Sequence, residues 1–243
     1  MMIPMAEWHL AVARVSVFLS PDGAVSPTLW QDVVGEEPET SLVQRATATR
    51  TASGPYADGS LSLQVQPMRI DWVLEPLPAM DSGAMPELGP FPTAAGPLLD
   101  LCRFWAKTEA FPSMLRIALG LVLMSPTPDR DSGYRELAEL IDGVPTDGDA
   151  TDFLYQINKP RDSRRAVGLR LNRLSKWSVG SYQLIGVVAG NPLKGQERCH
   201  LRLELDINTP ADRDVPLPAE NVEAILDDLF DGAIEVCKFG KLA

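Results

Sequence analysis

Residues 199–208 read CHLRLELDIN, and apolar side chains alternate with polar ones from Cys199 to Asn208. A period of two places every apolar side chain of an extended strand on the same face. The stretch therefore predicts a strand with one buried and one polar face. Such strands are typical of antiparallel sheets, in which one face can remain in water.

Further strands are predicted on the N-terminal side of this one, over residues 8–19, 61–66, 69–74, 115–124 and 153–157. A hairpin is predicted from strands 166–178 and 182–189, with its turn at Gly180-Ser181, because glycine and serine favour turns. The run 115–124 (LRIALGLVLM) is apolar at nearly every position. That pattern is typical of a central strand covered on both faces.

Three segments predict helices: 93–107, 132–142 and 218–239. The last is amphipathic, with an apolar stripe at helical spacing and carboxylates opposite, so we expect it to dock on a sheet. Runs of strands with few strand-helix-strand alternations favour an α+β fold with largely antiparallel sheets and packed helices over a doubly wound fold.

The most proline- and glycine-rich stretch, residues 76–92, reads PLPAMDSGAMPELGPFP. Such composition is typical of a linker. It suggests two lobes: a mostly β lobe over 1–76, a linker over 77–92, and an α+β lobe over 93–243. The alternative of one continuous domain stays open, because 243 residues suit either arrangement.

The composition is that of an ordinary globular protein, with 45% hydrophobic and 23% charged residues and a net charge of −11. A negative average field repels phosphate, so binding to nucleic acid would have to be local and binding to an anionic membrane is not expected. The first residues lack the basic and apolar regions of a signal peptide, and no run approaches the ~18 apolar residues of a membrane span. We therefore expect a cytoplasmic protein.

Few residues offer catalytic or metal chemistry. Only two histidines occur, His9 and His200, and the three cysteines are widely spaced, as expected of reduced structural thiols. Zinc spacings and phosphate-binding glycine loops are missing from the sequence, so we expect no cofactor, no metal and no assigned catalytic residue. Glu204 and Asp206 share one strand face and could act as an acid and base pair, although Arg202 beside them favours a charge ladder.

One segment departs from the acidic average. Residues 151–180 carry a net charge of +5, which leaves −16 for the rest of the chain. Its cations alternate with residues that can donate hydrogen bonds or stack. The candidate binding residues are Gln156, Asn158, Lys159, Arg161, Arg164, Arg165, Asn172, Arg173, Lys176 and Trp177.

Two interpretations of this basic segment stay open. The cations form a contact surface, or they pair internally with the acidic residues 204–235, whose net charge is −9. Because Pro160 and Asp162 favour a turn, we expect Arg161, Arg164 and Arg165 to project into solvent from a loop between strands.

The stretches DFLYQINKP (152–160), LNRLSKWS (171–178) and LDINT (205–209), followed by an acidic amphipathic helix, resemble a sporadically distributed family of uncharacterised bacterial proteins. The resemblance covers mainly the C-terminal hundred residues. Sporadic distribution implies horizontal mobility, which is consistent with phage defence. The resemblance implies no reaction and brings no catalytic residues.

These observations favour a non-enzymatic bacterial interaction protein or complex subunit with a protein partner. One alternative is a nucleic-acid-binding accessory that uses the basic segment 159–176. Another is a hydrolase that uses Glu204 and Asp206. The sequence does not predict the oligomeric state.

Overall fold

The computed structural model describes residues 7–77, 85–141, 152–188 and 191–240, and for 184–188 and 191–196 it describes the strands without their side chains. The described strands form one antiparallel sheet in the order β2-β3-β4-β5-β1-β7-β11-β10-β8, with β6 beside β1 and β9 beside β10. The strands are β1 (His9–Leu19), β2 (Thr40–Gln44), β3 (Thr49–Tyr56), β4 (Gly59–Gln66), β5 (Arg69–Pro76), β6 (Gly89–Pro90), β7 (Met114–Thr127), β8 (Leu154–Asn158), β9 (Arg161–Asp162), β10 (Arg170–Val188) and β11 (Asn191–Asn208).

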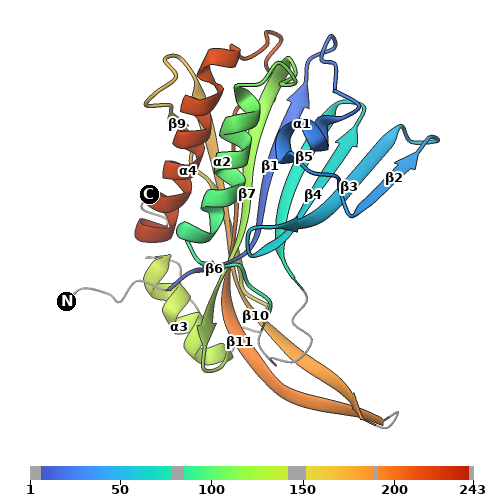
Figure 1. Ribbon diagram of the computed structural model, residues 1–243. Helices are drawn as coiled ribbons and strands as arrows, with labels where there is room; N and C mark the ends of the chain where they lie inside the picture. Colours follow the sequence, from blue (N-terminus) through green and yellow to red (C-terminus); the bar gives the residue numbers. More distant parts are fainter. Residues whose placement is uncertain (1–6, 78–84, 142–151, 189–190, 241–243) are drawn as a thin grey trace.

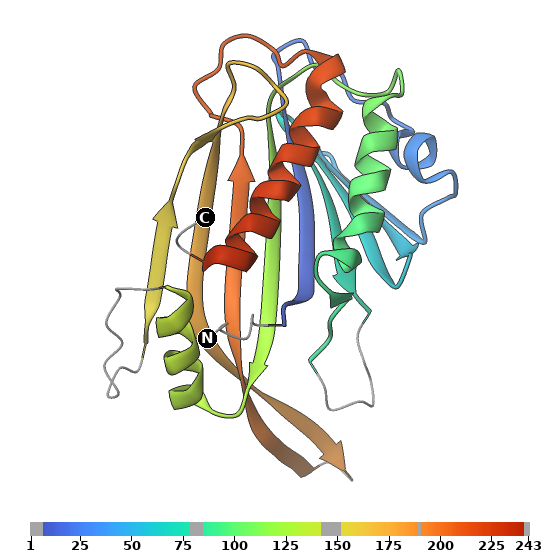
Figure 2. The same cartoon turned by 90° about the vertical axis from the view of Figure 1, so that its left-hand side faces the viewer.

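The four α-helices among the described residues lie on one face of this sheet: α1 (Leu29–Val34), α2 (Gly96–Ala106), α3 (Arg130–Leu140) and α4 (Val222–Phe239). Figures 1 and 2 show α2 and α4 side by side across the central strands. Their apolar sides meet the inward-facing side chains of the sheet, and Trp72, Trp105 and Leu229 are buried there. No helix among the described residues is long and apolar enough to span a membrane.

The chain is therefore an α+β protein built on one large antiparallel sheet, as the strand patterns predict. The strand predicted at 199–208 forms the C-terminal part of β11, and its leucines are buried while Arg202 and Glu204 are not. The helices predicted at 93–107, 132–142 and 218–239 correspond to α2, α3 and α4.

The two segments expected to be lobes both contribute strands to this sheet, because β1 pairs with β7 from His9 to Leu19. Part of the expected linker, residues 78–84, lies outside the described residues. Downstream of it, β6 pairs with the start of β1, through His9 with Pro90 and Leu10 with Gly89.

The predicted turn at Gly180-Ser181 is wrong. β10 continues without a break from Arg170 to Val188, and Gly180 pairs with His200 of β11. The imidazole of His200 fills the space above Gly180, where an added Cβ would lie 2.8 Å from Nε2. The glycine thus makes room for a neighbouring ring rather than for a turn.

The strand 115–124 is central, as predicted, since β7 lies between β1 and β11. The expectation that both of its faces are covered is wrong. One face meets the helices, and the other lies on the face of the sheet that carries none of the described helices (Figure 2). Gly120 and Val122 of β7 lie on that second face, in the lining of a hollow.

Candidate functional site

The face of the sheet without helices, hereafter the open face, is hollowed at its centre. The hollow has a volume of about 610 Å³, and β1, β4, β5, β7, β8, β10 and β11 line it. Its polar lining consists of Arg14, Ser62, Gln64, Asp71, Glu75, Gln156, Lys176, Glu204 and Asp206. Hydrophobic residues such as Val12, Val73 and Val122 lie between them. The lining is thus mixed, with charges of both signs and amides over a partly apolar floor.

The register of the strands explains how distant residues meet there. Val73, Arg14, Gly120 and Asp206 occupy one row across β5, β1, β7 and β11. Opposite residues in an antiparallel sheet point to the same side, so the whole row faces the hollow. Arg14 and Asp206 thus lie on either side of Gly120.

Gly120 leaves the space that the side chain of Arg14 uses. A Cβ added at Gly120 would lie 3.3 Å from Nη2 and 3.4 Å from Nε of Arg14. The guanidinium group therefore lies across the middle strand of the sheet. Glycine weakens a strand interior and often marks a site that another group approaches closely. The approach of Arg14 is consistent with the glycine at this position.

Two of the carboxylates at the hollow are neutralised by neighbours. Asp71 accepts hydrogen bonds from Ser16 and Arg69. Glu204 forms ion pairs with Lys176 and Arg202, at 3.3 and 2.8 Å. Partial burial alone would raise the pKa of Glu204, but these hydrogen bonds and charges outweigh it and lower the pKa. Glu204 is consequently held ionised.

Three other ions have no charged partner in the part of the chain that the structure describes. Arg14 and Glu75 form neither a hydrogen bond nor an ion pair there, and Asp206 accepts one hydrogen bond, from the Asn208 amide at 2.9 Å. Arg14 and Glu75 are also exposed. The hollow therefore offers unpaired charges of both signs to a ligand.

A cationic stack borders the hollow on the same face. Phe18 lies within 5.1 Å of the Arg69 guanidinium and 4.7 Å of the Arg116 guanidinium, each over its ring. Cation–π contacts of this kind hold long side chains in place. The aromatic ring is occupied by these contacts, and the Arg69 guanidinium also donates to Asp71 and Ser16.

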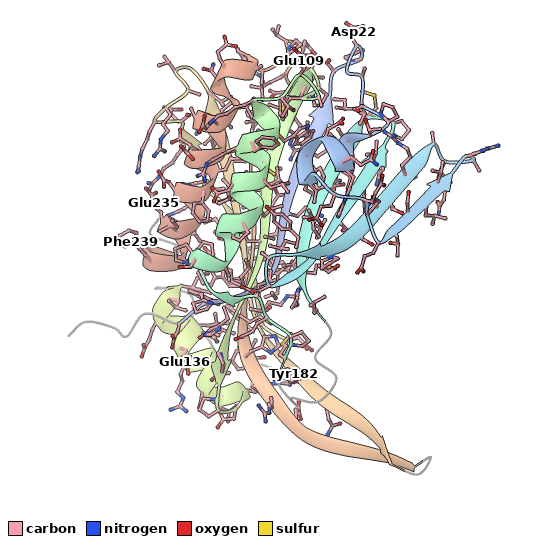
Figure 3. The ribbon with its side chains drawn as sticks, viewed as in Figure 1. Asp22, Glu109, Glu136, Tyr182, Glu235 and Phe239 are labelled. Atoms are coloured by element: carbon pink, nitrogen blue, oxygen red, sulfur yellow. The ribbon has the colours of Figure 1, made fainter. Side chains whose placement is uncertain are left out.

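Four arginines of the basic segment form ion pairs with acidic residues of α4. Arg161, Arg164 and Arg173 all contact Glu235, which Figure 3 labels on α4. Arg165 contacts Asp228 and Asp231. Arg161, Arg164 and Arg165 are exposed, as expected of arginines that project into solvent, but all three are also ion-paired, so the internal-pairing interpretation describes these residues.

Trp177 and Arg173 lie on the face of the sheet that the helices cover, which the sequence pattern alone does not show. Trp177 is completely buried, packs edge-on against Trp8 with ring centres 6.0 Å apart, and donates to the hydroxyl of Ser175. Its ring has no surface left for stacking on a ligand. Arg173 is 4% exposed, and burial together with the nearby charge of Arg161 lowers its pKa.

The remaining candidates lie on or near the open face. Gln156 and Lys176 line the hollow directly. Asn158 donates to Asn172 at 3.3 Å, and Asn172 donates in turn to Asn208 at 3.1 Å, so these amides form a chain across three strands. The backbone of Lys159 pairs with Arg173. The predicted set is thus divided between the two faces.

Sequence reasoning missed Arg14, Glu75 and Gly120. One signal was present: Arg14 is the only charged residue in the run LAVARVSVFL. A charge inside an otherwise apolar strand must face water or a partner. Gly120 within LGLVLM is a second signal, because an isolated glycine in a strand indicates a close approach.

The histidine and cysteine side chains do not form a reactive pair in the described structure. Burial raises the pKa of the Cys102 and Cys237 thiols. Burial and the charge of Arg202 lower the pKa of His200. Cys199 and His200 are adjacent on β11 and so point to opposite faces. Among the described residues, no group of three potential Cys, His, Asp or Glu ligands could hold a metal ion.

Comparison of the whole sequence with protein-family models and with curated proteins finds no match. The geometry and charge of the open face are therefore the observations that bear on function.

Proposed function

We propose that the chain is a non-enzymatic, cytoplasmic subunit of a bacterial complex that holds a polypeptide segment of a partner protein on its open face. The observation that supports this proposal is the hollow of about 610 Å³ with the unpaired charges of Arg14, Glu75 and Asp206. A sheet face that is both uncovered and hollowed offers an extended segment many side-chain contacts at once.

The charge of the hollow favours a polypeptide over a nucleic acid. Four carboxylates and two cations line it, which gives a net charge of −2 within a chain of −11. A phosphate backbone would be repelled by this lining. A polypeptide can offer lysine or arginine to Glu75 and Asp206, a carboxylate to Arg14, and backbone amides to Gln64 and Gln156.

The basic segment contributes less to this surface than a nucleic-acid interface would require. Its arginines at 161, 164, 165 and 173 already contact α4. The proposed hydrolase alternative is also less favoured, because a general acid needs a raised pKa and that of Glu204 is lowered. An ionised Glu204 is better suited to binding than to proton donation.

The resemblance to a sporadically distributed bacterial family extends the proposal to its setting. Horizontal mobility suits an accessory system such as phage defence, in which small subunits assemble with the products of neighbouring genes. Within such a complex, the open face would position one segment of another subunit.

Copurification with the products of neighbouring genes tests the proposal. Arg14→Glu should abolish retention of the partner, because it replaces attraction with repulsion at the centre of the hollow. Arg135→Glu makes the same change of charge on an exposed site of α3 and should retain the partner. Both variants should melt within a few degrees of the wild type, since exposed unpaired charges contribute little to stability.

Two results would contradict the proposal. Retention of every partner by Arg14→Glu would show that the open face is not the docking surface. Binding of a single-stranded oligonucleotide that weakens steeply with salt, and that Arg14→Glu abolishes, would identify the ligand as nucleic acid instead.

A further inference from the structure

Strand β2 ends the sheet without the features that usually protect an edge. Its sequence, TSLVQ, contains no charged residue and no proline, and all five residues are exposed. Leu42 and Val43 are 55% and 59% exposed. Beyond β2 no further described strand continues the sheet. Natural proteins block such edges with lysine, proline or bulges, because open edges pair with other chains.

The residues on either side of β2 carry opposite charges. Glu39 precedes the strand and Arg45 follows it, and both are exposed. Neither forms an ion pair with any described residue. The strand thus has an acidic start, an apolar centre and a basic end.

We infer that β2 pairs antiparallel with β2 of a second copy of this chain, around a two-fold axis at Leu42. In this register all five residues of the strand pair, and Leu42 lies opposite its own copy. Glu39 of each chain then lies opposite Arg45 of the other. The self-complementary charge pattern is the observation that selects a second copy as the partner, since isologous contacts require it.

In the proposed register, paired residues of the two copies lie on the same face of the sheet. Ser41 and Val43 border the apolar groove beneath α1, whereas Leu42 points to the open face. Centring on Leu42 places Ser41 opposite Val43, so groove-side residues meet groove-side residues. A shift of one residue would place them opposite residues of the other face.

A contact of five residues is small, and two chains of net charge −11 repel each other at long range. We therefore expect a weak dimer that dissociates on dilution and strengthens with moderate salt. Sedimentation equilibrium over a wide range of concentrations should show a rise from the mass of one chain to the mass of two. A single-chain mass at every concentration would overturn the inference.

A charge exchange tests the register. Arg45→Glu places two glutamates opposite each other at both ends of the contact, and should weaken dimerisation at least tenfold. The double variant Glu39→Arg with Arg45→Glu restores opposite charges and should recover dimerisation. Arg135→Glu is the matched control and should leave the association unchanged. Equal association of all four proteins would overturn the assigned register.

A disulfide trap tests the geometry directly. Opposite residues in an antiparallel pair have Cα atoms about 4.5 to 5.5 Å apart, within the range that a disulfide bridges. Leu42→Cys, in a Cys199→Ser background, should form a covalent dimer under mild oxidation. Gln66→Cys, on an exposed position of β4 inside the sheet, should not. Equal trapping at both positions, or at neither, would contradict pairing through β2.

Discussion

Asp228 lies in the middle of α4, and its carboxylate accepts hydrogen bonds from the loop that precedes β10. The donors are the hydroxyl of Ser163 and the backbone N–H groups of Arg164 and Arg165, the latter two at 2.9 and 3.0 Å. Arg165 adds an ion pair. Since Asp228 is only 6% exposed, this one side chain satisfies donors that water reaches poorly.

Asp228→Ala should therefore lower the free energy of unfolding by about 2 to 4 kcal/mol, because it leaves several partly buried donors unpaired. Asp227→Ala is the matched control. Asp227 pairs with Arg103 at a more exposed site of the same helix, and its loss should cost less than about 1 kcal/mol. Denaturant unfolding measures both; equal losses would show that the loop contacts of Asp228 contribute nothing specific.

The same carboxylate makes stability depend on pH. Burial alone would raise the pKa of Asp228, but the hydrogen bonds from Ser163 and Arg165 outweigh it and lower the pKa below its ordinary value of 3.8. In that range the unfolded chain binds more protons than the folded one, so stability is present above pH 3.8 and is lost as the pH falls toward the folded pKa.

Asp228→Asn removes this titration. The free energy of unfolding should consequently fall less steeply with acidification in the variant than in the wild type. Unfolding curves measured at pH values on both sides of the ordinary pKa give the two slopes. Parallel slopes would assign the acid sensitivity to other carboxylates.

At the scale of elements, α4 and the loop at 161–165 act as one unit because three arginines of the loop contact three acids of the helix. The arginines at 161, 164 and 165 are 47%, 64% and 40% exposed, so each ion pair by itself is screened and weak. Reversing the charges of all three arginines together should cost more, since it creates repulsion at every contact.

Replacing Arg161, Arg164 and Arg165 together with glutamate should lower the melting temperature by several degrees. A chain of this size loses about 2 to 4 °C for each kcal/mol. The corresponding glutamine variant should lose less, because it removes attraction without adding repulsion. Added salt should narrow the gap between the glutamate variant and the wild type. An unchanged melting temperature would mean that the loop does not depend on α4.

At the scale of the whole molecule, the β10–β11 hairpin extends beyond the body of the sheet, as Figures 1 and 2 show. The last pairing of β11 with β7 is Cys199 with Thr127, and past it the two strands of the hairpin pair with each other. Tyr182, labelled in Figure 3 at the base of this extension, pairs with Arg198 of β11, and its hydroxyl accepts a hydrogen bond from the backbone N–H of Met85.

Shortening the hairpin should therefore leave the fold intact. Gln183 pairs with Glu197, so replacing residues 184–196 by Asn-Gly would close the strands with a two-residue turn. The free energy of unfolding should change by less than about 1 kcal/mol, because the shortened strands lie beyond the last pairing of β11 with β7. Circular dichroism and thermal melting measure this change. A large loss would show that the hairpin end supports the body.

Much of the fold was predictable because it depends on local patterns. The alternation at 199–208 predicts β11, the apolar run at 115–124 predicts a central strand, and the stripe in 218–239 predicts α4. The prediction of a turn at Gly180-Ser181 was wrong because glycine also occurs where a neighbouring ring approaches the backbone. Here the ring belongs to His200, which is twenty residues away along the chain, so a local pattern does not show it.

The candidate site was predictable only in part. Residue parity shows from the sequence alone that Lys176 and Trp177 point to opposite faces of one strand. It does not show which face the helices cover. Gln156 and Lys176 were predicted and lie at the hollow, whereas Arg14 and Glu75 come from β1 and β5, which reach the same hollow only in the assembled sheet.

The class of structure, the main strands and helices, and the excess of acidic over basic residues follow from the sequence alone, because periodicity and charge are local or additive properties. Which cations are neutralised depends on the folded arrangement. Arg161, Arg164 and Arg165 find their partners on α4, about seventy residues later in the chain, while Arg14 lies above Gly120 with no charged partner among the described residues. Ion pairing depends on distance in space, and the register of β1, β7 and β11 sets that distance.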